Sequence, residues 1–267
     1  MNLLLKPVRS SLGKKYAMAV TGLLLIGFVV AHMSGNLLIY LGPDALNSYA
    51  QALKARPALL WAARGGLLAV FLVHLFLAFR LTRQNYAARP TAYVYEETLQ
   101  ATWASRHMML TGLVLLLFIA YHLAHFTLGV VHPADVQVVN GEVIDLRQEK
   151  NYLDLAEIRR GGGKDYVAEP SADYGKLNKL KEVDARHDVY SMVVSGFRVW
   201  WISVTYLLAM AFLGLHLWHG GSSFLQSLGL NGFGYARVIG AIGPVLAVVV
   251  VAGNCSIPIS VMLGIVR

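Results

Sequence analysis

The sequence predicts an all-α protein, a polytopic membrane bundle of five transmembrane helices with a long extramembrane loop between helices three and four. Two observations predict this fold class. The chain of 267 residues is 56% hydrophobic and only 14% charged, with a mean hydropathy of +0.53, unlike ordinary soluble domains. Its apolar residues also gather in long runs with the charges between them, and an uncharged run of about 18 or more residues is typical of a transmembrane helix.

The first helix is predicted over residues 16–41, which include no formal charge. The basic leader before it resembles that of a signal peptide. We expect an uncleaved anchor instead, because the apolar run is too long and lacks a small-x-small cleavage site. Pro43 is expected to close this helix, and a short loop leads on to Pro57.

Four further helices are predicted over residues 58–81, 107–131, 199–220 and 237–265, and Pro258 is expected to kink or end the last of them. The predicted organisation is one membrane domain. It consists of helices one to three (1–132), an extracytoplasmic loop (133–195) and helices four and five (196–267).

The predicted loop has a different composition from the rest of the chain. Residues 133–195 hold twelve of the 15 acidic residues and nine of the 23 basic ones, which indicates a segment outside the membrane. Two patches rich in β-branched residues, 136–139 and 143–146, predict a small hairpin within it.

The distribution of Lys and Arg predicts the orientation. The leader, the loop 80–106 and Arg237 bring nine of these residues to one side, whereas the short loop opposite has only Lys54 and Arg56. The positive-inside rule therefore predicts a cytoplasmic amino terminus and, after five spans, a carboxyl terminus outside.

Each of the first four predicted helices contains a histidine at a similar fraction of its length: His32, His74, His122 and His216. An ionisable side chain inside a membrane helix indicates a functional site, because hydrocarbon offers it no partner. Since the helices alternate in direction, His32 and His122 are expected nearer the outer face, and His74 and His216 nearer the cytoplasm. At a rise of ~1.5 Å per residue, the two layers would lie roughly 11 Å apart.

Two facing imidazoles in a helical bundle suit haem b, whose iron takes two axial ligands while the bundle holds the flat ring. Two axial histidines fill the coordination sphere and leave electron transfer as the expected chemistry. A single membrane histidine is as often a hydrogen-bonding residue of the bundle interior, but four at matched depth favour ligation. Small residues nearby would let the ring approach the backbone, although they also pack helices; they are Gly27, Gly35, Ala78 and Gly214.

Further side chains leave alternatives open. His125 and His219 each stand three residues after a candidate ligand, so either could be the ligand itself, a propionate partner or a hydrogen-bond donor beside it. Arg64 could hold a propionate or a quinone carbonyl, or extend to the interface. The remaining histidines (His107, His132, His187) are interpreted as surface residues, and six aromatics (Tyr40, Trp61, Trp103, Trp200, Trp201, Tyr206) as an interfacial belt.

Other function classes find no support in the sequence. The net charge of +8 does not indicate nucleic-acid binding, because the charges flank apolar runs and form no basic face. A single cysteine, Cys255, excludes an intrachain disulfide and a thiolate cluster. We find no phosphate loop and no nucleophile constellation.

Short motifs surround the histidines on all four helices. They are SLGKK (11–15), AHMSGNL (31–37), VHL (73–75) with QN (84–85), YHL (121–123), DVY (188–190), and HLWHGG (216–221) followed by QSLGLN (226–231). Together they make the chain resemble the single-subunit, five-helix, dihaem cytochrome b membrane anchors of succinate:quinone oxidoreductases, which are succinate dehydrogenases and fumarate reductases. The loop 133–195 is longer than in the compact members of that family.

The resemblance implies two haem b groups. It implies that His32 and His122 bind the iron of an outer haem, and that His74 and His216 bind the iron of an inner one. In the family the first histidine of the third and fourth helix motifs is the ligand, which favours His122 over His125 and His216 over His219.

The resemblance also implies the partners and the reaction. The chain would be the membrane subunit of a succinate:quinone oxidoreductase in a prokaryotic cytoplasmic membrane, joining the tricarboxylic acid cycle to the respiratory chain. An iron–sulfur subunit and a flavoprotein subunit would dock on it, and electrons would pass through the inner and outer haems to membrane quinone. Menaquinone is the expected quinone, although the residues do not distinguish it from ubiquinone and do not locate its site. This chain itself would carry no dicarboxylate chemistry.

Two alternatives remain at this point. One is a dihaem cytochrome b of another respiratory complex, such as a hydrogenase or a ferric reductase. The other is a haem-free transporter or proton channel that uses its histidines as a relay.

Overall fold

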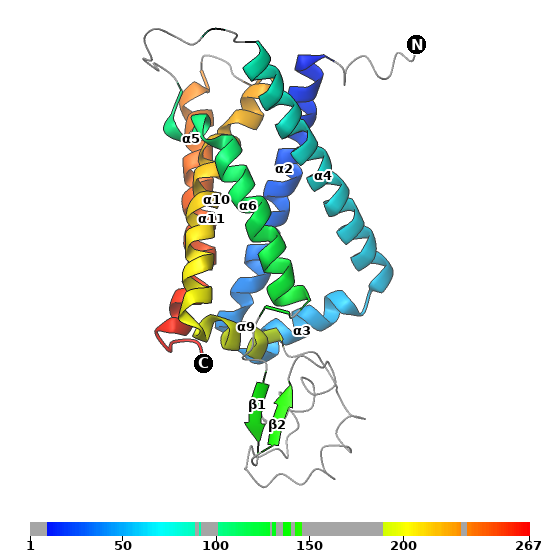
Figure 1. Cartoon of the computed structure of the whole chain (residues 1–267), viewed down its shortest axis with the longest axis vertical. Coiled ribbons are helices and arrows are strands. Elements are labelled where there is room, and N and C mark those ends of the chain that lie inside the picture. The colour runs from blue at the N-terminus through cyan, green and yellow to red at the C-terminus, as the bar shows by residue number, and fades with distance from the viewer. Residues whose placement is uncertain are drawn as a thin grey trace. The chain divides into compact units, whose positions relative to one another are not determined.

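The computed structural model describes residues 10–88, 91, 101–128, 130–131, 136–139, 142–145, 189–230 and 234–267. Several features of the sequence lie outside these residues: the basic leader up to Arg9, the Glu96-Glu97 pair, His132, His187 and most of the predicted loop 133–195. The element order along the chain can be followed in Figure 1.

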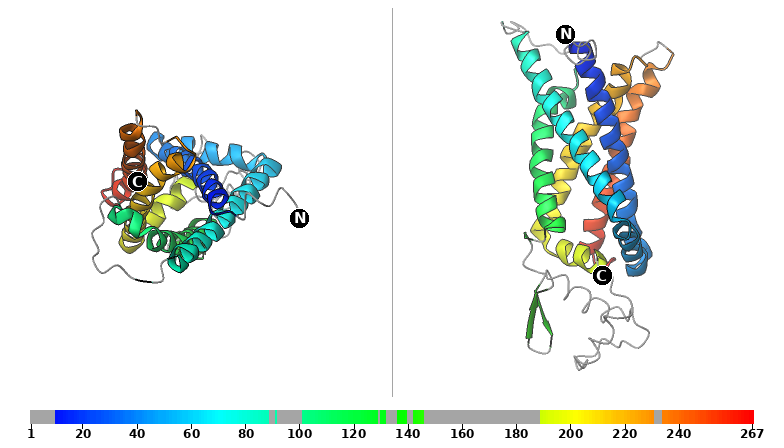
Figure 2. Two further views of the ribbon diagram at one scale, coloured as in Figure 1. Left: turned by 90° about the horizontal axis from the view of Figure 1, so that it is seen from above. Right: turned by 90° about the vertical axis from the view of Figure 1, so that its right-hand side faces the viewer.

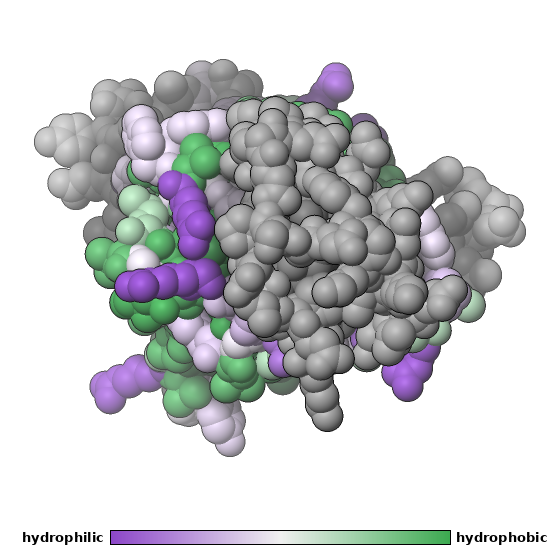
Figure 3. Space-filling model, turned by 90° about the horizontal axis from the view of Figure 1, so that it is seen from below, coloured by the Kyte–Doolittle hydropathy of each residue, from purple (hydrophilic) through white to green (hydrophobic). Residues whose placement is uncertain are grey.

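The described residues include five helices that are long and apolar enough to cross a membrane, so the chain is a multi-pass membrane protein. Large hydrophobic side chains along them face outward: Leu72 and Val249 are each more than half exposed. Figure 3 likewise shows hydrophobic side chains at the surface. The five are α2 (Ser11–Asn36) with a 3₁₀ segment (Leu37–Leu41), α4 (Pro57–Ala87), α6 (Met108–His122) with a π-helical segment (Leu123–Thr127), α10 (Trp200–Ser227) and α11 (Ala236–Met262).

Three shorter helices were not predicted: α3 (Pro43–Lys54), α5 (Trp103–Arg106) and α9 (Val189–Arg198). The expectation of a loop before Pro57 was wrong, because Pro43 begins a helix there. Gly42, with φ of 97°, turns the chain, and proline is well suited to the first position of the helix that follows. The last helix also continues four residues beyond Pro258, so this proline does not end it.

The two described strands form an antiparallel hairpin, β1 (Val136–Val139) with β2 (Glu142–Asp145). They lie where the sequence pattern indicated a hairpin, and the second begins one residue earlier than the pattern suggested.

The chain divides into two compact units. Unit 1 comprises Met1–Met33, Trp61–Leu117 and Leu208–Asn254, and unit 2 comprises Ser34–Leu60, Phe118–Leu207 and Cys255–Arg267. In unit 1, segments of all five long helices pack side by side (Figure 2). Each segment contacts the next and the last contacts the first, so the five form a closed ring. Hydrogen bonds join α2 to α4 (Thr21 and His74), α4 to α6 (Thr82 and Met109), α6 to α10 (Thr111 and His216) and α10 to α11 (Ser222 and Gly240). The ring closes where Gly253 of α11 packs against Met33 of α2.

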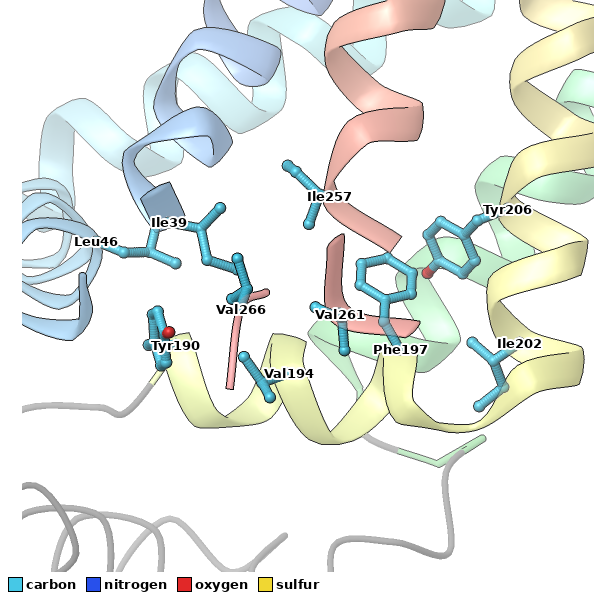
Figure 4. Packing of buried hydrophobic residues seen from close by; sticks show 10 residues of the cluster. All are labelled: Ile39, Leu46, Tyr190, Val194, Phe197, Ile202, Tyr206, Ile257, Val261 and Val266. Carbon is cyan, nitrogen blue, oxygen red and sulfur yellow. The ribbon is translucent and has the colours of Figure 1, made fainter. Parts of the chain in front are cut away.

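Unit 2 has its own apolar core, drawn in Figure 4. Polar contacts fix its edges. The fully buried Asn47 of α3 accepts a hydrogen bond from the backbone N–H of Tyr190 (2.9 Å), which otherwise has no acceptor at the start of α9. Tyr190 in turn donates its hydroxyl to the carbonyl of Arg267. The core residues are Ile39, Leu46, Tyr190, Val194, Phe197, Ile202, Tyr206, Ile257, Val261 and Val266.

Candidate functional site

In unit 1, His74 of α4 faces a Thr-Gly pair on α2. Its Nδ1 lies 3.1 Å from Oγ1 of Thr21. A methyl group placed on Gly22 would lie 3.6 Å from Cε1 of the same ring, so the imidazole rests against the helix backbone at van der Waals distance.

His216 of α10 has the same surroundings on α6. Its Nδ1 lies 3.1 Å from Oγ1 of Thr111, and a methyl group on Gly112 would lie 3.5 Å from its Cε1. Unit 1 therefore contains the same arrangement twice, built from two different pairs of helices.

The hydroxyls determine which ring nitrogen carries the proton. Thr21 donates its single hydroxyl hydrogen to the carbonyl of Ala17 (2.8 Å), shared with that of Met18 (3.1 Å), and Thr111 donates to the carbonyl of Met108 (3.0 Å). With that hydrogen engaged, each Oγ1 can accept a hydrogen bond, which favours the tautomer that carries the proton on Nδ1 of each histidine. The Nε2 lone pair is the one left for a ligand, and within the described chain neither Nε2 has a hydrogen-bond partner.

His74 and His216 stand on different helices of unit 1. Both side chains are partly buried. Two neutral imidazoles with Nε2 unengaged, held by hydrogen-bonded partners among apolar helices, form a donor set that fits bis-histidine haem ligation.

In unit 2, His122 and His125 share one partner. The hydroxyl of Tyr206 on α10 lies 3.2 Å from Nδ1 of His122 and 2.9 Å from Nδ1 of His125. A π-helical turn begins directly after His122 and contains His125. Such turns are frequent at functional sites.

His125 is enclosed by protein on both edges of its ring. It is 4% exposed, its ring stacks on that of Phe126 with centroids 3.9 Å apart, and its Nδ1 meets Tyr206. On the other edge, a methyl group on Gly196 would lie 3.0 Å from Nε2. The space beside Nε2 is thus taken by the α9 backbone, which indicates a packing role for His125 and makes His122 the better candidate to hold a ligand.

The neighbouring Tyr121 adds a second polar group to this cluster. Its hydroxyl is the only buried side-chain polar atom among the described residues that makes no hydrogen bond. Its ring centroid lies 6.0 Å from that of His125 and 6.0 Å from that of Tyr206.

His32 lies on α2, stacked on Phe28 one turn earlier with ring centroids 5.4 Å apart. Phe118 stands in the same position before His122, at 5.9 Å. His32 belongs to unit 1 and His122 to unit 2, so their pairing at an outer haem stays a prediction.

Other expected site residues have ordinary surroundings. Arg64 stacks over Trp61, its Cζ 5.0 Å from the ring centroid of a tryptophan that is 66% exposed, which favours an interfacial role. Gly35 packs against Tyr49 and Gly214 against Val251, so both serve helix packing. His219 is half buried, one turn beyond His216 on α10.

Three residues of the site were missed or misread in the sequence. Thr21 and Thr111 were not singled out, and Tyr206 was assigned to the interfacial belt although it is 6% exposed and contacts two histidines. A signal for the threonines exists. A Thr-Gly pair begins eleven positions before His32 and again eleven positions before His122, with Phe28 and Phe118 four positions before each histidine.

Comparisons with protein-family models, characterised proteins and solved structures found no match to this chain.

Proposed function

We propose that this chain is a dihaem cytochrome b and serves as the membrane anchor of a succinate:quinone oxidoreductase. One observation supports it above the others. His74 and His216, on two different helices of unit 1, each carry the Nδ1 proton toward a threonine hydroxyl and so keep Nε2 available. This is the state in which imidazole binds a metal, and a hydrogen bond at the other nitrogen is its usual companion.

In this proposal His74 and His216 hold the inner haem, and His32 and His122 hold the outer one. When bound, haem b would supply one-electron transfer. The residues of the chain position it: Thr21 and Thr111 orient the inner imidazoles, Tyr206 orients that of His122, and the apolar helices exclude water. The unpaired buried hydroxyl of Tyr121 is a polar group that a ligand of unit 2 could satisfy.

The proposed partners and orientation rest on the resemblance of the histidine motifs to those of the dihaem cytochrome b anchors. A flavoprotein and an iron–sulfur subunit would dock on the cytoplasmic face of a prokaryotic membrane, and quinone, expected to be menaquinone, would exchange electrons with this subunit. The amino terminus would be cytoplasmic and the carboxyl terminus outside.

The decisive experiment is a reduced-minus-oxidised absorption spectrum of the purified membrane protein, with haem quantitation. Two haem b groups per chain are expected. A preparation without haem would reject the proposal and leave the histidine-relay transporter.

Gentle purification from the native membrane tests the remaining alternative, a dihaem cytochrome b of another respiratory complex. The chain should bring with it a flavoprotein and an iron–sulfur subunit, and the preparation should oxidise succinate with quinone. A dihaem preparation with a different redox partner would instead place this cytochrome in another respiratory complex.

A further inference from the structure

We propose that Thr21 and Thr111 are positioning residues that set the reduction potential of the inner haem through the imidazoles of His74 and His216. The inference rests on the proposed function, because it assigns these two histidines to one haem. It adds a pair of residues outside the ligand set and states what each hydroxyl does to the ligand that it faces.

The same series of hydrogen bonds is found at His74 and at His216. Each imidazole Nδ1 meets a threonine Oγ1 at 3.1 Å, and each threonine passes its own hydrogen to a carbonyl one turn earlier in its helix. Both hydroxyls are sheltered, since Thr21 is 8% exposed and Thr111 is fully buried. The shelter of the hydroxyls limits competition from water, so the helix that carries each threonine favours one tautomer of the histidine that it faces.

Thr205 shows that the contact with histidine is separate from ordinary helix back-bonding. Its hydroxyl donates to the carbonyl of Trp201 at 2.8 Å, in the manner of Thr21 and Ala17. It makes no other hydrogen bond within the described chain. The threonines of the two Thr-Gly pairs therefore make one contact more than their helices require.

The effect on the metal follows from the direction of the bond. An acceptor at Nδ1–H makes the imidazole a more basic ligand, and a more basic ligand stabilises ferric over ferrous iron. The two hydroxyls should thus lower the potential of the inner haem. Removing either should make this haem easier to reduce and leave the outer haem unchanged.

The test compares Thr21→Val and Thr111→Val with Thr205→Val in the whole chain, purified with its partner subunits. Valine keeps the shape of threonine and removes the oxygen. We expect the ferrous-to-ferric ratio of the inner haem at a fixed ambient potential to rise up to about tenfold in the first two variants, or up to about 59 mV for a one-electron couple. The low-spin ferric EPR signal of that haem should shift as well, and haem retention should fall about tenfold or more.

Serine at either position keeps the hydroxyl and should restore the wild-type potential and EPR signal. Wild-type potentials in both valine variants would overturn the inference, as would equal shifts in Thr205→Val. If a valine variant fails to assemble while the serine variant assembles with an unshifted potential, the hydroxyl requirement is supported.

Failure of the proposed function can be distinguished from failure of the inference about the threonines. If the wild-type protein contains no haem, the proposed function fails. The tautomers can then still be read from the nitrogen chemical shifts of ¹⁵N-labelled histidine. Loss of the Nδ1–H form in the valine variants would support positioning by the threonines, and its persistence would overturn it.

Discussion

In unit 1 each of His74 and His216 faces a hydroxyl of its own, whereas in unit 2 His122 and His125 share the phenol of Tyr206. Each threonine hydroxyl donates its hydrogen to a backbone carbonyl of its own helix. Such a carbonyl keeps its place whichever rotamers the neighbouring side chains adopt. The phenol has one hydrogen for two imidazoles. If His122 binds metal through Nε2, Tyr206 must accept from His122 and donate to His125, so the two rings depend on each other.

This difference predicts that substitutions beside the histidines of unit 1 and beside those of unit 2 act independently. A change at one threonine should stay with one imidazole. A change at Tyr206 should reach two residues and the core around them, because its ring also packs edge-on against Phe197 and Phe118.

Replacing His74 or His216 by alanine makes the largest change. The proposed ligand scheme predicts that either variant loses the inner haem and keeps the outer one, so the haem content falls from two per chain to one. Quantitation and the reduced-minus-oxidised spectrum measure this directly. Loss of both haems in each variant, in protein that remains folded, would contradict the independence of the two layers.

Tyr206→Phe should have the next largest effect, confined to unit 2. Without the hydroxyl, the Nδ1 atoms of His122 and His125 lose their hydrogen bond to Tyr206, at a cost of about 1–3 kcal/mol in the free energy of unfolding. Thermal unfolding in detergent should show this loss, and the outer haem alone should change its spectrum. Tyr40→Phe is the control, because Tyr40 bonds Ser260 (2.9 Å) and is 43% exposed.

His125→Leu distinguishes the two histidines of unit 2. Because both edges of the His125 ring meet protein, we expect the variant to lose about 1–3 kcal/mol of stability and to keep both haems. His122→Leu should lose the outer haem. If the two variants exchanged these outcomes, His125 would be the ligand and the assignment would have to be reversed.

Gly22→Ala should have the smallest effect. Its methyl group would sit at ordinary contact distance from His74, and alanine favours a helix over glycine by roughly 0.5–1 kcal/mol, so stability should rise by no more than that amount and the inner haem spectrum should be nearly unchanged. In Gly214→Ala the methyl group would approach Val251 to 2.8 Å, and overpacking should destabilise the protein by about 1–3 kcal/mol. A large spectral change in Gly22→Ala would show that the imidazole needs the glycine itself.

The long helices were predictable because the bilayer imposes a simple length and hydrophobicity rule on them, and the five predicted runs overlap α2, α4, α6, α10 and α11. The short helices α3 and α9 were missed because they obey a different rule. They are amphipathic, they need a partner to bury their apolar faces, and that partner is distant in sequence. Pro43 illustrates the ambiguity, since proline can end one helix or begin the next.

The candidate site shows the same limit. The histidines could be found because an ionisable residue stands out in an apolar run. Thr21, Thr111 and Tyr206 do not stand out, since threonine and tyrosine are common in membrane helices and their importance lies in which helix is opposite. The glycines proposed for haem approach were chosen by proximity in sequence, and the structure gives Gly35 and Gly214 to neighbouring side chains.

Helix α11 carries no histidine, yet it governs where one of them stands. Gly221 of α10 lies against Gly243 of α11 with almost no space between the two backbones, and Ser222 accepts from the N–H of Gly243 at 3.0 Å. His216 is little more than one turn away on α10. Any side chain larger than hydrogen at this crossing would push α10 outward and move the imidazole of His216 with it, so α11 sets the position of a histidine that it does not carry.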